Sequence, residues 1–230
     1  MNDLQKMGGV AALFHSAAYL VGIGLYLTVM SVIIDADPAQ YVALLADYQT
    51  LLYVWIFIAY WVSGFCLVIV ALAFYDRLKA DLPVLVQTGT VLGLIWAGLI
   101  IASGNLMLHG FGEVADLYGK DPAEAETVWV AIKIVENGIV SGNELIGGLW
   151  VLLLSWAALR TGKLNKALNT LGLVIGVAGI VSIVPVLAEV AVTIFGLSMI
   201  VWFAWLGIIL LRRSHSAAVE QPDAFVPATT

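Results

Sequence analysis

Charged residues and cysteine are both scarce in this chain of 230 residues. Asp, Glu, Lys and Arg make up 11% of the sequence, whereas about a quarter of the residues of a typical soluble domain are charged. Hydrophobic residues make up 62%. This balance excludes an ordinary soluble protein and predicts a chain that folds within a lipid bilayer. The one cysteine, Cys66, lies in an apolar run, which excludes a disulfide framework and a thiolate metal site.

Recognisable catalytic and cofactor motifs are also absent from the sequence. The apolar runs contain no GxSxG or HExxH motif and no histidine–acid cluster. His15 and His109 differ too much in expected depth to ligate one haem between them. A net charge of −6 supplies no basic patch, so nucleic acid is excluded as a partner. We therefore predict no catalytic residue, no bound metal and no cofactor.

Six long apolar runs, separated by short polar breaks, make up most of the sequence. A helix needs about 20 apolar residues to cross the hydrocarbon core of a bilayer, so each run predicts a transmembrane helix. The predicted spans are residues 9–34, 50–75, 84–108, 135–159, 167–187 and 190–211. They predict an all-α polytopic membrane helical bundle. One transmembrane domain covers residues 1–213, and the composition of residues 214–230 predicts a disordered C-terminal tail.

The Lys and Arg residues between the runs predict the orientation of the bundle. Basic residues near the ends of spans stay on the cytoplasmic side of the membrane. Eight of the ten Lys and Arg residues fall on one side, and only Lys120 and Lys133 fall on the other. This bias predicts that both termini are cytoplasmic.

Two of the predicted outer loops carry the start signal of a helix. In residues 37–40 and 121–124, an aspartate precedes a proline, and Gln or Glu follows at the third helical position. Aspartate is a preferred N-cap residue and proline is preferred at the first helical position. Each loop therefore predicts a short helix lying at the membrane interface.

The fourth run contains the polar residues that indicate an interior site. At 100° per residue, Lys133, Asn137, Ser141 and Glu144 fall on one face of a single helix, and Asn143 adjoins Glu144. Polar side chains in hydrocarbon face the bundle interior or a water-filled cavity. This interior stripe is predicted to bind a proton, a cation, or the amine or hydroxyl of a ligand. In the alternative interpretation, protonated Glu144 donates a hydrogen bond to a neighbouring helix.

A second group of polar residues lies near the outer ends of the runs. The group comprises Asn105, His109, Glu136 and Glu189. These residues are predicted to line an outer vestibule that binds a cation or a polar headgroup, with a metal as a less favoured occupant. Ordinary interfacial polarity is the alternative. Within the first run, His15 and Tyr19 lie one turn apart, and a hydrogen-bonded core histidine is the favoured interpretation of His15.

Glycine pairs at GxxxG spacing predict close helix packing. They are Gly138 with Gly142 and Gly172 with Gly176. Packing inside the bundle is the main interpretation of both pairs, and a homo-oligomer formed through either pair is the alternative. The glycines at 138 and 142 are also where the fourth span would divide into two half-helices around a site.

Four segments of the sequence resemble a known protein family. They are residues 4–9 (LQKMGG), 116–122 (DLYGKDP), 137–152 (NGIVSGNELIGGLWVL) and 171–179 (LGLVIGVAG). In combination they resemble domain of unknown function 4386, a family of bacterial membrane proteins, over nearly the whole chain. The resemblance implies a helical bundle in the bacterial cytoplasmic (inner) membrane, and it implies no activity, substrate or catalytic residue. His15 departs from the less polar pattern of the family.

Three kinds of function are open at this point. The favoured one is a membrane-embedded protein that binds or transports a small ligand, a lipid or a cation at the site around Glu144. The second is a scaffold or accessory subunit whose glycine faces pack against partner proteins. The third is an intramembrane enzyme that modifies a lipid, with Glu144 as general acid or base near His109. The sequence contains no nucleophile or metal set to support the third.

Overall fold

The computed structural model of the protein describes residues 3–30, 37–140 and 143–219. Within these ranges every regular element is a helix, which confirms the predicted all-α fold class. The elements are α1 (Asp3–Leu25), η1 (Tyr26–Met30), α3 (Pro38–Ile56), η2 (Phe57–Val62), α4 (Ser63–Leu78), α5 (Pro83–Tyr118), α6 (Pro122–Val140), α7 (Asn143–Thr161), α8 (Lys166–Val181) and α9 (Ala188–Val219). The short elements η1 and η2 are π-helical, so each hydrogen bond spans five residues instead of four.

Five stretches of the chain are helical and apolar over enough length to cross a membrane. They are Asp3–Thr28, Asp47–Leu78, Pro83–Tyr118, Pro122–Thr161 and Ala188–Arg212, and in the fourth of them residues 141–142, between α6 and α7, lie outside the described residues. Helix α8, in the predicted fifth span, has 16 residues and a length of about 24 Å, shorter than the roughly 30 Å of a hydrocarbon core. It ends at Val181 because the ring of Pro185 would clash with the carbonyl four residues earlier in a continued helix. The sixth span stays a prediction.

Several helix boundaries differ from the predicted spans. Helix α1 begins at Asp3 rather than at residue 9, and residues 31–34 lie outside the described part of the chain. The predicted start of the fourth span, at residue 135, lies inside α6, which continues to Val140. Helix α9 runs through Val219, past the predicted end of the domain. The predicted spans mark apolar length, whereas a helix also continues through polar residues, so the helices extend past the spans and the span boundaries stay predictions.

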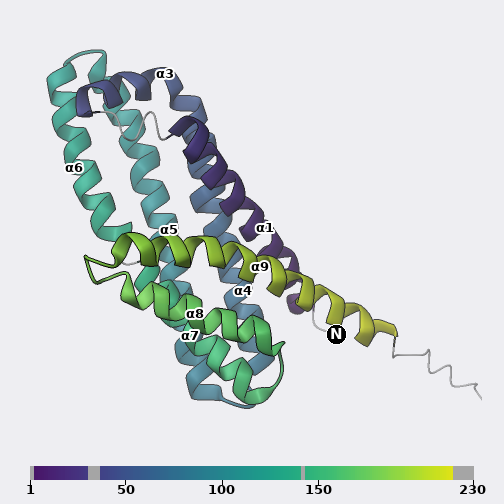
Figure 1. Ribbon diagram of the computed structural model, residues 1–230. Coiled ribbons are helices and arrows are strands. Elements are labelled where there is room, and N and C mark those ends of the chain that lie inside the picture. Colours follow the sequence, from purple (N-terminus) through teal and green to yellow (C-terminus); the bar gives the residue numbers. More distant parts are fainter. Residues whose placement is uncertain (1–2, 31–36, 141–142, 220–230) are drawn as a thin grey trace, which may run out of the picture.

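Six of the helices form a closed ring. Each packs against the next in the order α1, α4, α5, α7, α8 and α9, and α9 packs against α1. Figure 1 shows α8 and α9 crossing the long helix α5. A side chain at Gly9 would meet Leu211, so the beginning of α1 lies beside the end of α9. The ring therefore closes with the first helix, α1, packed against the last helix, α9.

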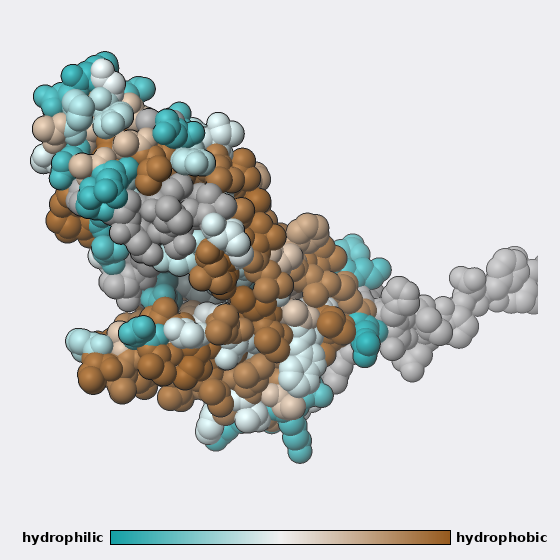
Figure 2. Space-filling view, turned by 45° about the horizontal axis from the view of Figure 1, so that its top comes forward, coloured by the Kyte–Doolittle hydropathy of each residue, from teal (hydrophilic) through white to brown (hydrophobic). Residues whose placement is uncertain are grey.

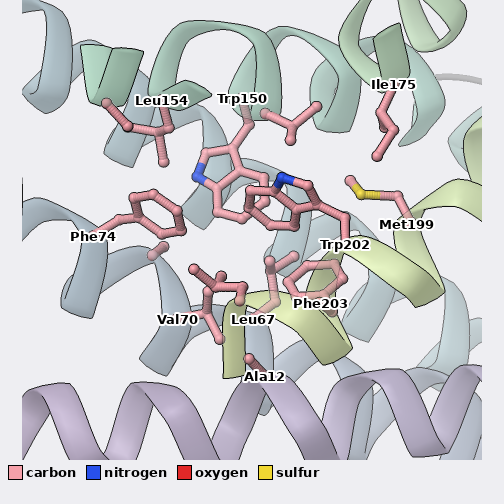
Figure 3. Packing of buried hydrophobic residues seen from close by; sticks show 14 of the residues in the cluster. Ala12, Leu67, Val70, Phe74, Trp150, Leu154, Ile175, Met199, Trp202 and Phe203 are labelled. Carbon is pink, nitrogen blue, oxygen red and sulfur yellow. The ribbon is translucent and has the colours of Figure 1, made fainter. Parts of the chain in front are cut away.

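Aromatic side chains fill the centre of the ring. Trp150 of α7 contacts Trp202 of α9 at a ring distance of 5.7 Å, and Phe74 of α4 stacks on Trp202 at 5.7 Å. Figure 3 shows these rings together with Phe203. Trp96 of α5 joins them at 5.6 Å from Trp150. All five rings are at most 2% exposed. Because lipid tails are as apolar as these rings, close packing rather than exclusion from water holds the helices together.

The glycines of α8 are used for packing within the chain. Gly172 faces Ser155 of α7, Gly176 faces Leu152, and Gly179 faces the backbone at Gly148. A side chain at any of these α8 positions would overlap α7, which explains the GxxxG spacing. On α6, a side chain at Gly138 would meet nothing within 4 Å, and Gly142 lies outside the described residues.

Two basic turns lie side by side at one end of the ring. The guanidinium of Arg77, at the end of α4, donates a hydrogen bond of 3.2 Å to the carbonyl of Lys163 in the α7–α8 turn. Lys163 donates one of 3.1 Å to the carbonyl of Arg77 and pairs with Asp81. Arg77 also donates a 3.3 Å hydrogen bond to Gln5 of α1. The start of α1 and both turns therefore share one end of the molecule.

The other end carries a second hydrophobic cluster, which we call the helical cap. Its buried side chains come from three helices: Tyr41, Val42, Leu45, Leu52, Trp55 and Ile56 of α3, Met107, Phe111 and Val114 of α5, and Ala125 and Trp129 of α6. Helix α5, with 36 residues and a length of about 54 Å, reaches from the ring into the cap. Figure 2 shows hydrophilic residues gathered on the cap and hydrophobic residues over the ring.

Both predicted helix starts in the cap are confirmed. The carboxylate of Asp37 accepts a hydrogen bond of 2.9 Å from the backbone of Gln40. Asp121 accepts hydrogen bonds of 3.1 Å from the backbones of Ala123 and Glu124. The first helix bends at Tyr48 before it continues toward the ring. The second is longer than predicted, and its position at the membrane interface stays a prediction.

Replacing Asp121 by alanine is expected to loosen the start of α6. Loss of an N-cap side chain costs about 1 kcal/mol of helix stability. Hydrogen–deuterium exchange measured by mass spectrometry should therefore become faster at residues 122–126. The control is Asp116→Ala, which removes an exposed carboxylate from the last turns of α5. Equal exchange at residues 122–126 in both variants would contradict the capping role.

Candidate functional site

A cavity of about 260 Å³ lies where the ring meets the helical cap. Its lining residues come from seven elements: Tyr19, Gly22 and Ile23 of α1, Tyr26 of η1, Trp55 of α3, Ala59 and Tyr60 of η2, Trp96 and Ile100 of α5, Asn143 and Glu144 of α7, and Phe195 of α9. Trp55 belongs to the core of the cap, whereas Trp96 and Phe195 belong to the core of the ring. This membership places the cavity at the junction of the two.

The backbone around the cavity departs from the α-helix on two sides. Tyr26 belongs to η1 and Tyr60 to η2, and π-helical turns occur often at functional sites. The indole of Trp55 donates a hydrogen bond of 3.1 Å to the carbonyl of Gly22 and so joins α3 to α1. A side chain at Gly22 would begin 3.3 Å from the Cβ of Ala59, so glycine permits this close approach.

The polar end of the cavity is the first turn of α7. Glu144 lies in that turn, where the helix dipole favours a negative charge. The Oδ1 atom of Asn143 is buried and has no hydrogen-bond partner among the described residues. Gly179 of α8 packs directly against the carbonyl of Glu144, which fixes the position of this turn. Tyr19 of α1 lines the same cavity as Glu144.

His15 lies one turn from the cavity and is part of the core. Its Nδ1 donates a hydrogen bond of 2.9 Å to the carbonyl of Ser63, because a carbonyl oxygen only accepts. The ring lies 4.1 Å from that of Phe203 and 4.8 Å from that of Tyr19, and the residue is 1% exposed. His15 is thus a hydrogen-bonded core residue that supports the Tyr19 wall.

The structure divides the predicted interior stripe. Asn143 and Glu144 line the cavity, whereas Lys133 belongs to the cap helix α6 and lies 3.0 Å from Glu136. Asn137 is exposed on α6, and Ser141 lies outside the described residues. The projection at 100° per residue assumed one straight helix, and residues 141–142 of that stretch lie outside the described part of the chain, between α6 and α7.

The residues of the predicted outer vestibule do not line the cavity. Asn105, His109 and Glu189 are exposed, and Glu136 is 5% exposed on the inner face of α6. Burial and the nearby Glu136 raise the pKa of Tyr41 in the cap. Among the described residues, no three His, Cys, Asp or Glu side chains are grouped closely enough to hold a metal ion. The vestibule stays a prediction.

The aromatic lining of the cavity was not predicted. Trp55, Trp96 and Phe195 come from three helices that are far apart in the sequence, so their meeting depends on the order of helices in the ring. One signal was available in the first run. Tyr19, Gly22 and Tyr26 recur at the spacing of one helix face, which places two phenols around a glycine.

Comparisons with known proteins assign the chain to a family. No curated protein and no solved structure matches it significantly. A family model, domain of unknown function 4386, matches residues 9–213. This match covers most of the ring, the cap and the lining of the cavity, and it confirms the family that the sequence motifs indicated, although residues 4–8 of the first motif lie outside the match. The chain therefore belongs to the family of domain of unknown function 4386.

Proposed function

We propose that this protein is a six-span membrane protein of the bacterial cytoplasmic membrane that binds, and in its working cycle transports, a small ligand at the Glu144 cavity. The cavity itself carries the proposal. It places a carboxyl group, an amide and phenol hydroxyls among apolar and aromatic walls, which is the composition of small-molecule sites. A cavity of about 150 Å³ holds benzene, so one of 260 Å³ has room for a larger molecule.

The arrangement of the ring supports six spans with both termini in the cytoplasm. The start of α1, the end of α9 and the two basic turns lie at one end, away from the cavity. Helix α8 begins after the Lys163 turn and reaches Glu144 at Gly179, so it covers the same depth as α7. An even number of crossings follows if α8 spans the membrane, and the basic end faces the cytoplasm by the distribution of charge.

A binding function is favoured over an accessory-subunit function by the use of the glycines. The glycines at 172 and 176, which motivated a packing surface for partners, pack α8 against α7 of the same chain. The lipid-modifying alternative is weakened because His109 is exposed and does not line the cavity with Glu144.

Native mass spectrometry of the protein in mild detergent tests the binding function. The wild-type chain is expected to carry a small molecule, and Glu144→Gln is expected to lose it, since a hydrogen bond to a charged group contributes about 1.5–3 kcal/mol, or roughly 10- to 100-fold in affinity. Glu124→Gln, at an exposed position of α6, is the control and should retain the molecule. The proposal would be contradicted if the purified wild-type chain carries no small molecule and also binds none that is added.

A further inference from the structure

We propose that the ligand of the Glu144 cavity is an arylalkylamine, an organic ammonium ion with an aromatic body. This inference rests on the proposed binding function and specifies the substrate class of the same site. It follows from three properties of the cavity: a carboxyl group without a basic partner in the lining, an unpaired acceptor, and aromatic walls.

The charge of the lining favours a cation. Glu144 carries the one carboxyl group among the described lining residues, and none of those residues is a lysine or an arginine. The nearest lysine in the sequence, Lys133, is 3.0 Å from Glu136 in the cap. An anionic ligand would therefore meet a carboxylate without a compensating positive charge, whereas an ammonium ion supplies that charge.

The polar end of the cavity favours a ligand that donates hydrogen bonds. The buried Oδ1 of Asn143 accepts no hydrogen bond from the described residues, and the carboxyl group of Glu144 is the next residue along the same turn. A buried acceptor without a partner costs free energy. An ammonium group carries up to three donors and can satisfy both oxygens, and it gains charge-assisted hydrogen bonds to the carboxylate.

The walls fit an aromatic body attached to that cation. The rings of Trp96 and Phe195 meet edge to face at 6.1 Å, and those of Trp55 and Tyr60 meet in the same way at 5.9 Å. Aromatic rings pack well against one another, and their faces attract cations. Scaled from benzene in a cavity of about 150 Å³, the volume of 260 Å³ fits about ten non-hydrogen atoms.

Titration calorimetry on the full chain in phosphatidylglycerol nanodiscs, with three probes of matched shape, tests this class. The probes are 2-phenylethylamine, the neutral 2-phenylethanol and the anionic 3-phenylpropanoate. We expect saturable binding of the amine and weaker binding of the other two. Glu144→Gln should lower the affinity for the amine by about 10- to 100-fold and change the affinity for the alcohol by less than about threefold. Glu124→Gln should behave as the wild type, and Glu144→Asp, which keeps the carboxylate, should retain part of the preference for the amine.

An aminophospholipid headgroup offers the same ammonium chemistry from a second source. Nanodiscs that contain phosphatidylethanolamine distinguish the two, because a headgroup that occupies the cavity would compete with 2-phenylethylamine and lower its apparent affinity. Such competition would identify the lipid as the source of the amine. Unchanged affinity would assign the site to a free amine.

Failure of the ligand class and failure of the binding function give different results. If the alcohol or the anion binds as tightly as the amine, and Ala59→Leu, which fills the cavity, abolishes that binding, the amine class is wrong and the binding function stands. The same holds if the wild type retains a molecule that 2-phenylethylamine does not displace. If no probe binds and no molecule is retained, both proposals are overturned.

Discussion

Replacing Gly148 by valine is expected to leave little folded protein. A side chain at this position of α7 would begin 2.9 Å from the carbonyl oxygen of Gly176 and 2.9 Å from the Cα of Gly179. Both are backbone atoms of α8, so no change of side-chain rotamer relieves the overlap. Helices α7 and α8 make the most extensive helix contact in the described chain, and the valine would have to separate them.

Size-exclusion profiles and thermal midpoints in one detergent measure this effect. Gly148→Val should elute mainly as aggregate. Gly148→Ala adds a single methyl group and should cost about 1–3 kcal/mol, which lowers the midpoint by roughly 2–12 °C. Gly98→Ala is the control, because a side chain there meets nothing within 4 Å and alanine favours the helix. A monodisperse Gly148→Val protein with a wild-type midpoint would show that α8 does not pack on α7 in this way.

The sequence predicts the helices and their starts because these depend on local chemistry. Asp37 and Asp121 cap helices as expected, since an aspartate before a proline satisfies backbone donors without help from distant residues. The extent of α5 was missed for a related reason. Residues after 108 are more polar, but Phe111 and Val114 continue its apolar face against α6, and this face is buried by protein instead of lipid.

The candidate site was predicted in part. Glu144 was identified because an acid inside an apolar run is rare and must face the interior. Lys133 and Asn137 were assigned to the same stripe on the assumption of one straight helix, and the structure places both on α6, outside the lining of the cavity. The aromatic walls depend on the order of helices in the ring and on π-helical turns, and no local pattern in a single sequence determines either.

Removing the indole of Trp150 is expected to be the most damaging change in the centre of the ring. Trp150 is fully buried and contacts the rings of Phe74, Trp96, Trp202 and Phe203. A buried tryptophan replaced by alanine costs about 3–5 kcal/mol, because the lost contacts leave a cavity that the neighbours fill incompletely. The thermal midpoint in detergent should fall by roughly 6–20 °C.

Trp156→Ala is the matched control, since this tryptophan lies on the same helix, is 48% exposed and faces Arg160 at the surface. The thermal midpoint of Trp156→Ala should stay within a few degrees of the wild-type value, because surface substitutions change stability little. Trp150 also contacts Trp96, which lines the Glu144 cavity. At temperatures where Trp150→Ala remains folded, it should therefore weaken ligand retention, whereas Trp156→Ala should not. Equal midpoints for the two variants would mean that the aromatic cluster does not hold the ring together, and would remove the support for the cavity wall at Trp96.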